Sequence, residues 1–409
     1  MYAIRTRLTE AFATFMVLAA ASSAALAQKA YDPGATDTEI KIGTIMPYSG
    51  PASAYAVIGK TEAAYFKKIN AEGGINGRQI NFISYDDAYS PPKAVEQARK
   101  LVESDEVLLI FSAVGTPSNS AIQKYMNAKK VPQLFIVSGA TKWNSPKEFP
   151  WTMGWQPNYQ SEPQIYAKYI LKEKPGAKIA VLYQNDDFGK DYLKGLRGGL
   201  GAKAASMIVG EASYETSEPT IDSHIVKLKS TGADVFFNIA TPKFAAQAIK
   251  KIAEIDWKPL HFLINPSASI GGVIKPAGFD ISQGIISTAF VKDWTDPQWK
   301  TDPGMKEFNE FMDKYYPEGD RSDTQVIRGY SYAQTMVYVL KQCGDNLTRA
   351  NVMKQAASIK GLELGGLLPG IKISTSADDF APIKQMQLQK FQGDTWLRFG
   401  DVIAGEGGG

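Results

Sequence analysis

Two loops of small and hydroxyl-bearing residues offer the clearest binding chemistry in the chain. Residues 112–119 follow an apolar segment and lead into a predicted helix, and residues 138–141 follow the next apolar segment. Backbone N–H groups at a helix start, together with threonine hydroxyls, favour an anion such as a carboxylate. Gly115 and Gly139 would let the backbone approach a ligand closely. Simple capping of the helix by Thr116 is the alternative interpretation.

Side chains suited to catalysis or metal binding are few. The chain has two histidines, His224 and His261, and one cysteine, Cys343, which excludes a His/Cys zinc site, a Cys-X-X-Cys pair and an internal disulfide. We expect His224 at the surface, and His261 and Cys343 as structural residues. The sequence also has no G-x-S-x-G, G-x-x-x-x-G-K or H-E-x-x-H motif. It therefore predicts no enzyme, no catalytic residue, no metal and no cofactor.

Two pairs of adjacent aspartates follow predicted strands, Asp86-Asp87 and Asp186-Asp187. Such pairs can form an acid/base couple or a cation site. The interpretation we favour is that these carboxylates cap the following helices or face solvent.

Length and composition indicate a globular protein of two average-sized domains. The chain has 409 residues, of which 44% are hydrophobic and 21% charged. Because 45 Lys and Arg nearly balance 42 Asp and Glu, and no basic stripe stands out, we expect no nucleic-acid partner.

The N-terminus has the layout of a secretory signal peptide. Arg5 and Arg7 precede an uncharged apolar run at residues 11–25, and residues 25–27 form a small-residue cleavage motif. The run is shorter than a membrane span of about 20 residues. Residues 1–27 are therefore predicted to direct export to the periplasm, and we expect no membrane insertion of the mature chain.

The rest of the chain alternates between strand and helix periodicity. The first series has predicted strands at 40–45, 80–84, 107–111 and 134–137, and helices at 54–71, 91–102 and 118–129. The second has helices at 160–172, 189–199, 219–230 and 243–255, and strands at 179–183, 205–209, 235–239 and 260–264. Residues 303–358 are predicted mostly helical, and 383–399 a hairpin. This alternation predicts an α/β fold with parallel sheets covered by helices on both faces.

Several motifs resemble the leucine/isoleucine/valine-type periplasmic binding proteins, the type I solute receptors of ATP-driven importers. The motifs are Ile42-Gly43, Tyr48-Ser49-Gly50-Pro51, Asn70-Ala71-Glu72-Gly73-Gly74-Ile75-Asn76-Gly77, Tyr85-Asp86-Asp87 and Phe188-Gly189. The resemblance covers nearly the whole mature chain in order. It implies two doubly wound lobes joined by three crossings, with the ligand between them. The expected lobes are residues 28–153 with 291–365, and 154–290 with 366–409.

The resemblance also implies a site. A ligand carboxylate would be held by Gly115, Thr116 and Thr141, with the carbonyl of Gly139 lining the cleft. Amino-acid receptors of this family carry a glutamate for the ligand ammonium, but the matching stretch 265–269 has no acid, and an unpaired buried ammonium is costly. The predicted ligand-binding residues are Tyr48, Tyr55, Gly115, Thr116, Gly139, Thr141, Trp155, Phe188 and Ser267.

The sequence thus predicts a periplasmic receptor of an ABC transporter, acting by binding alone. It would capture a small carboxylate, preferably an aromatic or apolar acid, close around it, and deliver it to the membrane permease. A monomer is expected. The alternatives are a branched-chain amino acid or amide receptor of the same family, a ligand sensor subunit, and a secreted hydrolase.

Overall fold

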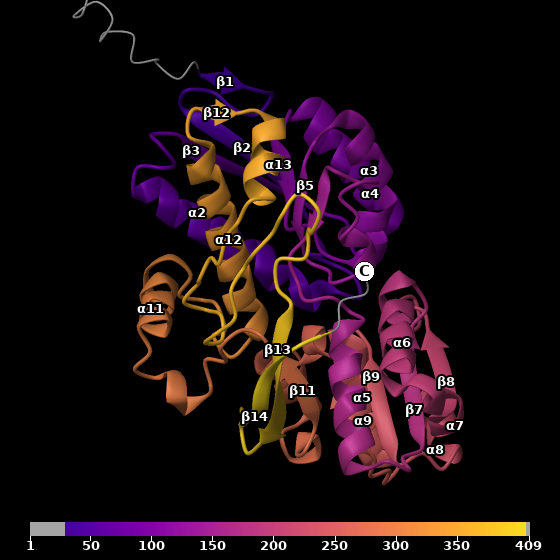
Figure 1. Ribbon diagram of the computed structural model, residues 1–409. Helices are drawn as coiled ribbons and strands as arrows, with labels where there is room; N and C mark the ends of the chain where they lie inside the picture. Colours follow the sequence, from indigo (N-terminus) through magenta and orange to yellow (C-terminus); the bar gives the residue numbers. More distant parts are fainter. Residues whose placement is uncertain (1–28, 406–409) are drawn as a thin grey trace, which may run out of the picture.

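The computed structural model describes residues 29–405, which form two α/β lobes (Figure 1). The predicted signal peptide, residues 1–27, lies outside the described residues. Within 29–405, no helix is both long and apolar enough to cross a membrane. The two lobes confirm the predicted fold class.

The first lobe is built on a five-stranded parallel sheet. Its strands, in spatial order, are β3 (Gln79–Asp86), β2 (Glu39–Met46), β4 (Leu109–Phe111), β5 (Gln133–Ile136) and β6 (Thr152–Gly154). Its crossover helices are α2 (Ala56–Ala71), α3 (Pro91–Arg99) and α4 (Thr116–Lys129). Helices cover both faces of the sheet, and β4 and β5 are buried along their whole length, as expected of parallel strands.

The second lobe contains a seven-stranded mixed sheet. Its spatial order is β14 (Thr395–Ala404), β13 (Gln385–Gln392), β11 (Ile286–Ala289), β10 (Leu260–Leu263), β9 (Val235–Ile239), β7 (Ile179–Gln184) and β8 (Ile208–Tyr214). The hairpin of β13 and β14 adds to β11 in antiparallel fashion, and the other pairs are parallel. Its helices are α5 (Ser161–Glu173), α6 (Asp187–Leu200), α7 (Ala204–Met207), α8 (Asp222–Ser230), α9 (Pro242–Glu254) and α10 (Lys275–Ala277).

One predicted strand was wrong. Residues 205–209 were expected to be extended, but Ala204–Met207 form the short helix α7, and β8 begins only at Ile208. The Ala-rich start of this segment favours helix. The strand is set instead by residues further on, because Ala212 and Tyr214 are the β8 side chains that reach the core.

A late helical segment returns to the first lobe. It comprises α11 (Pro303–Tyr315), α12 (Thr324–Cys343) and α13 (Arg349–Ala356). Helix α12 lies against α2 (Figure 1), and its Tyr330 ring lies 5.1 Å from Tyr65 of α2 and 4.9 Å from Phe311 of α11. Strand β1 (Ala30–Tyr31) pairs with β12 (Asn346–Leu347), which ties the start of the described chain to this segment.

Single turns of 3₁₀ or π helix join these elements. They are η1 (Ser53–Tyr55), η2 (Lys100–Ser104), η3 (Thr141–Trp143), η4 (Gly201–Lys203), η5 (Asn265–Ser267), η6 (Ile270–Ile274), η7 (Asp280–Ser282) and η8 (Pro297–Trp299).

The chain passes between the lobes after β6, after β11 and before β13. The second passage pairs with a later segment through the bridge of Val291 with Leu367. Beyond this bridge the chain still contacts the first lobe, because Thr375 donates its hydroxyl to the carbonyl of Ala356 in α13. Thr375 therefore still lies against the first lobe.

Helix α2 carries a buried acid against the sheet. Glu62 is fully buried and accepts a hydrogen bond from the Ser112 hydroxyl, while its Oε2 has no partner among the described residues. Burial raises the pKa of Glu62 well above its usual value, and the bond from Ser112 offsets part of that rise. Glu62 therefore stays protonated in the folded protein at pH values where the unfolded chain ionises.

We predict that Glu62→Gln gains stability over the wild type as the pH rises. Because the folded pKa is raised, wild-type folding takes up a proton above about pH 4.3, and its stability falls as pH increases. Between pH 5 and pH 7 the difference in free energy of unfolding should shift toward the variant. Denaturant unfolding at both pH values measures this, with Glu72→Gln at the exposed end of the same helix as control. A constant difference would contradict it.

Candidate ligand-binding site

A small cavity lies between the lobes, beyond the carboxyl ends of strands from both sheets. Such positions are where ligands bind in open α/β sheets. The residues that line this cleft cavity are Tyr55, Tyr89, Val114, Gly115, Thr116, Val137, Gln156, Tyr159, Phe188, Thr241 and Pro266. Its volume is about 20 Å³, close to the room that one water molecule needs. In this form the cavity has no room for a ligand larger than water, so we take the structure as a closed form of the receptor.

The two lobes present the same local structure to the cavity. In the first lobe, Gly115 lies just before α4 and Thr116 is the first residue of that helix. In the second, Thr241 lies between β9 and α9, whose first residue is Pro242. Both threonines line the cavity at the start of a helix, where the positive end of the helix dipole favours an anion or another hydrogen-bond acceptor.

The first-lobe loop can adopt this shape only with glycine at one position. Gly115 has a φ of 97°, and a Cβ atom there would lie 2.4 Å from the Tyr89 ring. Tyr89 is held over the loop by Asp87, which accepts its backbone N–H at 2.8 Å and the hydroxyl of Ser118 at 2.6 Å. The acidic pair after β3 therefore orders this wall of the cavity.

Three of the residues that line the cavity are tyrosines. Burial raises the pKa of Tyr55, Tyr89 and Tyr159, so these phenols keep their protons and act as hydrogen-bond donors. The Tyr159 hydroxyl is 3.3 Å from the side-chain oxygen of Gln156. Phe188 packs edge-on to Tyr159 with ring centres 5.4 Å apart. The cavity is thus rich in rings and in neutral donors.

Four of the residues predicted from the sequence line the cavity: Tyr55, Gly115, Thr116 and Phe188. Ser267 lies next to Pro266 in η5, but its hydroxyl donates to the carbonyl of Ala240 at 2.6 Å.

The remaining predicted residues lie outside the cavity. The Tyr48 hydroxyl lies 2.6 Å from that of Ser84, and Trp155 is fully buried and donates to Thr335 at 3.0 Å. The Gly139 carbonyl accepts the backbone N–H of Tyr159 at 2.7 Å.

Thr141 bonds to the opposite lobe. Its backbone N–H donates to Oδ2 of Asp191 in α6 at 2.7 Å, and its hydroxyl lies 2.9 Å from the same oxygen. The neighbouring Lys142 forms an ion pair with Asp187 at 3.1 Å. These contacts at the mouth of the cleft, which we call the latch, join the first lobe to α6.

The two aspartates of the second pair, Asp186 and Asp187, make different contacts. Asp186 caps α6 by accepting the backbone N–H groups of Phe188 and Gly189, as predicted, and its other oxygen accepts from Gln184 at 2.6 Å. Asp187 belongs to the latch. Neither carboxylate lines the cleft cavity.

Sequence reasoning missed Tyr89, Gln156, Thr241 and a buried cation behind the cavity wall. The Thr-Pro pair at a strand-to-helix junction occurs at both Thr116 and Thr241, so the repeated dipeptide was an available signal for the latter. The cation is Arg328 of α12, which is 1% exposed. Its Nη2 donates to the side-chain oxygen of Asn265 at 2.7 Å, while its Nε and Nη1 have no partner among the described residues.

The three residues with metal or redox chemistry lie away from this cavity. His224 is partly buried with Nε2 2.8 Å from Glu218, His261 is buried in β10, and Cys343 is a buried free thiol whose pKa burial raises to about 12. Within residues 29–405, no group of three His, Cys, Asp or Glu side chains is placed to hold a metal ion.

Comparison with known proteins identifies the family. Residues 39–395 match the family model described as periplasmic binding protein. A Leu/Ile/Val-binding protein homolog 1 from Brucella abortus is 24% identical over 352 residues, which cover 83% of this chain and 88% of the relative.

Solved structures show the same fold. A branched-chain amino acid ABC transporter protein from Thermus thermophilus with bound valine superposes with a TM-score of 0.80 at 16% identity, covering 90% of this chain and 98% of that one. An ABC transporter solute-binding protein from R. palustris in complex with benzoate gives 0.75 at 19% identity, with the same coverages of 90% and 98%. The chain belongs to the periplasmic binding protein family and is similar to its leucine/isoleucine/valine-binding members.

Proposed function

We propose that this protein is the periplasmic receptor of an ABC importer for a small carboxylate with an aromatic or otherwise apolar body. The ligand binds between the lobes, the closed form docks on the membrane permease, and the receptor works as a monomer. Export by the signal peptide at residues 1–27 places it in the periplasm.

The charge distribution around the cleft cavity carries the choice of a carboxylate. Among the described residues that line it, none is charged. A buried positive charge behind the wall lacks full pairing, because Arg328 keeps two N–H-bearing nitrogens without partners among the described residues. An ammonium group closed into this cavity would find no carboxylate among the lining residues, and Asp87 and Asp186 behind them already accept the backbone N–H groups of Tyr89 and Phe188. A carboxylate would meet phenol, hydroxyl and backbone donors.

Arg328 lies one layer behind the wall. Its charge acts on Tyr55 and Tyr332, lowering the pKa of each against the larger rise from burial. The Tyr332 hydroxyl accepts from the side-chain amide of Gln156 at 2.9 Å. Tyr55 and Gln156 line the cavity, so a ligand anion would interact with the guanidinium across this thin layer.

The shape of the site favours a flat or apolar ligand body. Four rings, those of Tyr55, Tyr89, Tyr159 and Phe188, line the cavity together with Val114, Val137 and Pro266. Ring stacking and apolar burial are the contacts that such a wall offers. The benzoate bound to the R. palustris protein of the same fold agrees with this choice.

A branched-chain amino acid is the second candidate. It is favoured by the relatives named Leu/Ile/Val-binding protein and by the valine bound to the Thermus protein. An acid close to the cavity wall is Asp186, which bonds to the lining residue Phe188 and already accepts hydrogen bonds on both oxygens. It would have to leave the α6 cap to reach an ammonium.

We predict that an acid without an amine binds more tightly than the matching amino acid. Phenylpropanoate should exceed phenylalanine by at least about tenfold, roughly 1.4 kcal/mol, because only the amino acid buries an unpaired ammonium. Competition calorimetry with matched pairs, including isovalerate and leucine, measures the difference. Tighter binding of phenylalanine or leucine would overturn the carboxylate proposal and point to Asp186.

We predict that Arg328→Met weakens binding of the acid but not of its amide. The variant should lose about tenfold in affinity for phenylpropanoate, since it removes the positive charge behind the wall, and should bind phenylpropanamide nearly as before. Methionine keeps an apolar stem of similar length, and replacing a buried charge by an apolar group is often tolerated. Equal losses for acid and amide would mean that Arg328 acts only on the shape of the site.

We predict that the latch stabilises the closed form without contacting the ligand. Asp191→Ala removes the acceptor of the Thr141 bonds, so the ligand-free protein should open and show a larger radius of gyration in X-ray scattering. Ligand affinity should fall by about threefold to tenfold, the effect of one or two lost hydrogen bonds.

Two further variants test whether Thr141 acts through lobe closure or by direct contact with the ligand. Asp222→Ala removes an aspartate from α8, outside the latch, and should change neither quantity. Thr141→Val should open the protein as Asp191→Ala does. A large affinity loss in Thr141→Val with an unchanged radius of gyration would instead mean that this hydroxyl contacts the ligand directly.

A further inference from the structure

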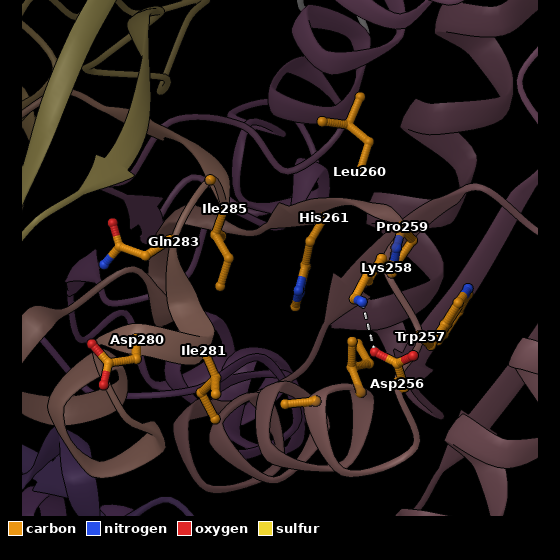
Figure 2. Close-up of a pocket in the computed structure, with 13 residues that line it drawn as sticks. Asp256, Trp257, Lys258, Pro259, Leu260, His261, Asp280, Ile281, Gln283 and Ile285 are labelled. Carbon is orange, nitrogen blue, oxygen red and sulfur yellow. Dashed lines mark ion pairs between the residues drawn. The ribbon is translucent and has the colours of Figure 1, made fainter.

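A second, larger pocket lies in the second lobe, far from the cleft. Its volume is about 490 Å³, within the usual range for small-molecule sites. It is formed by the end of α9, the start of β10, the turn η7 and the residues before β11 (Figure 2). The cleft lies beyond the carboxyl ends of β9 and β10, whereas this outer pocket lies at the amino end of β10, so the two cavities are separate.

Apolar side chains form part of the walls of the outer pocket. Ile252, Trp257, Leu260, Ile281 and Ile285 all line it. The indole N–H of Trp257 donates to the carbonyl of Ala233 at 3.0 Å, which leaves only apolar ring surface for the pocket. Ile281 is 43% exposed and lies where a ligand in the pocket would cover it.

One buried polar side chain projects into this pocket. His261 is 7% exposed, and Figure 2 shows it extending from β10 between Ile285 and Lys258. The amide nitrogen of Asn238 lies 3.3 Å from Nε2 of His261 and 3.3 Å from the carbonyl of Ala245. Because a carbonyl oxygen can only accept, the side-chain atom of Asn238 that faces Ala245 is its NH₂ group. The same NH₂ group faces Nε2 of His261, so Nε2 is the acceptor.

The proton of the imidazole is therefore on Nδ1. This nitrogen has no hydrogen-bond partner among the described residues and is not among their buried unpaired atoms. Burial lowers the pKa of His261 to about 3, so the ring stays neutral at physiological pH. His261 thus offers the pocket a fixed, neutral N–H donor beside its apolar side chains.

The rim of the pocket carries more negative than positive charge. Asp256 and Lys258 form an ion pair at 2.8 Å, visible in Figure 2. Asp280 lies on the opposite side of the pocket, and no ion-pair partner is found for it in the part of the chain that the structure describes. This excess disfavours an anionic ligand.

We propose that the outer pocket is a second ligand-binding site, for an uncharged small molecule with an apolar body and one hydrogen-bond acceptor that takes the Nδ1–H of His261. The site is independent of the cleft and of the carboxylate proposed for it.

The two histidines of the chain allow a direct test with benzamide as the probe. In protein labelled with ¹⁵N-histidine, NMR should first show His261 as the neutral Nδ1–H tautomer. Added benzamide should shift the His261 Nδ1 signal in a saturable manner and leave the signals of His224 in place. Toluene, which has no acceptor, and benzoate, which adds a negative charge, should each bind at least about tenfold more weakly.

Matched variants assign the shift to this pocket. Ile281→Arg places a long side chain at the mouth and should weaken benzamide binding at least about tenfold. Val226→Arg makes the same type of change at a 50% exposed position on α8 and should leave binding intact. Absence of a saturable His261 shift, its persistence in Ile281→Arg, or tighter binding of benzoate than of benzamide would overturn the proposal, whatever ligand the cleft takes.

Discussion

The binding site depends on hydrogen bonds between α12 and residues 155–156, the segment after β6 where the chain first passes from one lobe to the other. Trp155 donates to Thr335 at 3.0 Å and Gln156 donates to Tyr332 at 2.9 Å, both across the base of the cleft. Trp155 and Tyr332 also pack edge-on, with ring centres 4.5 Å apart. Since buried polar groups are costly when unpaired, this crossing cannot move away from α12, and the lobes must rotate about it.

Helix α12 also carries Arg328, the buried cation behind the cavity wall. Asn265 follows β10 and receives Nη2 of Arg328 from α12, while its backbone N–H donates to the buried Glu162 at 2.7 Å. Glu162 also accepts the hydroxyls of Tyr166 and Tyr192. The turn η5 is thus held by an acid from its own lobe and a cation from the other. It provides the second-lobe wall of the cavity through Pro266, which the closed form brings to Tyr55.

Local sequence patterns were sufficient for most of the strands and for some residues that line the cavity. Apolar runs bounded by glycine and proline predicted strands such as β9. The rule that ligands lie at the carboxyl ends of parallel strands singled out Gly115 and Thr116, which line the cavity. Tyr89 and Arg328 could not be found in this way, because each reaches the site through packing between distant segments. The partner of Thr141 depends on lobe closure, which no local pattern encodes.

The weakness of the latch suits a receptor that must also release its ligand. The Lys142–Asp187 pair is partly exposed at both ends, and such surface pairs contribute about 0–1 kcal/mol. The Thr141–Asp191 bonds add about 0.5–1.5 kcal/mol each. Because closure also removes contacts with solvent, these small gains leave the open and closed forms close in free energy. A ligand that contacts both lobes can then decide the population, and a permease that prefers the open form can reverse it.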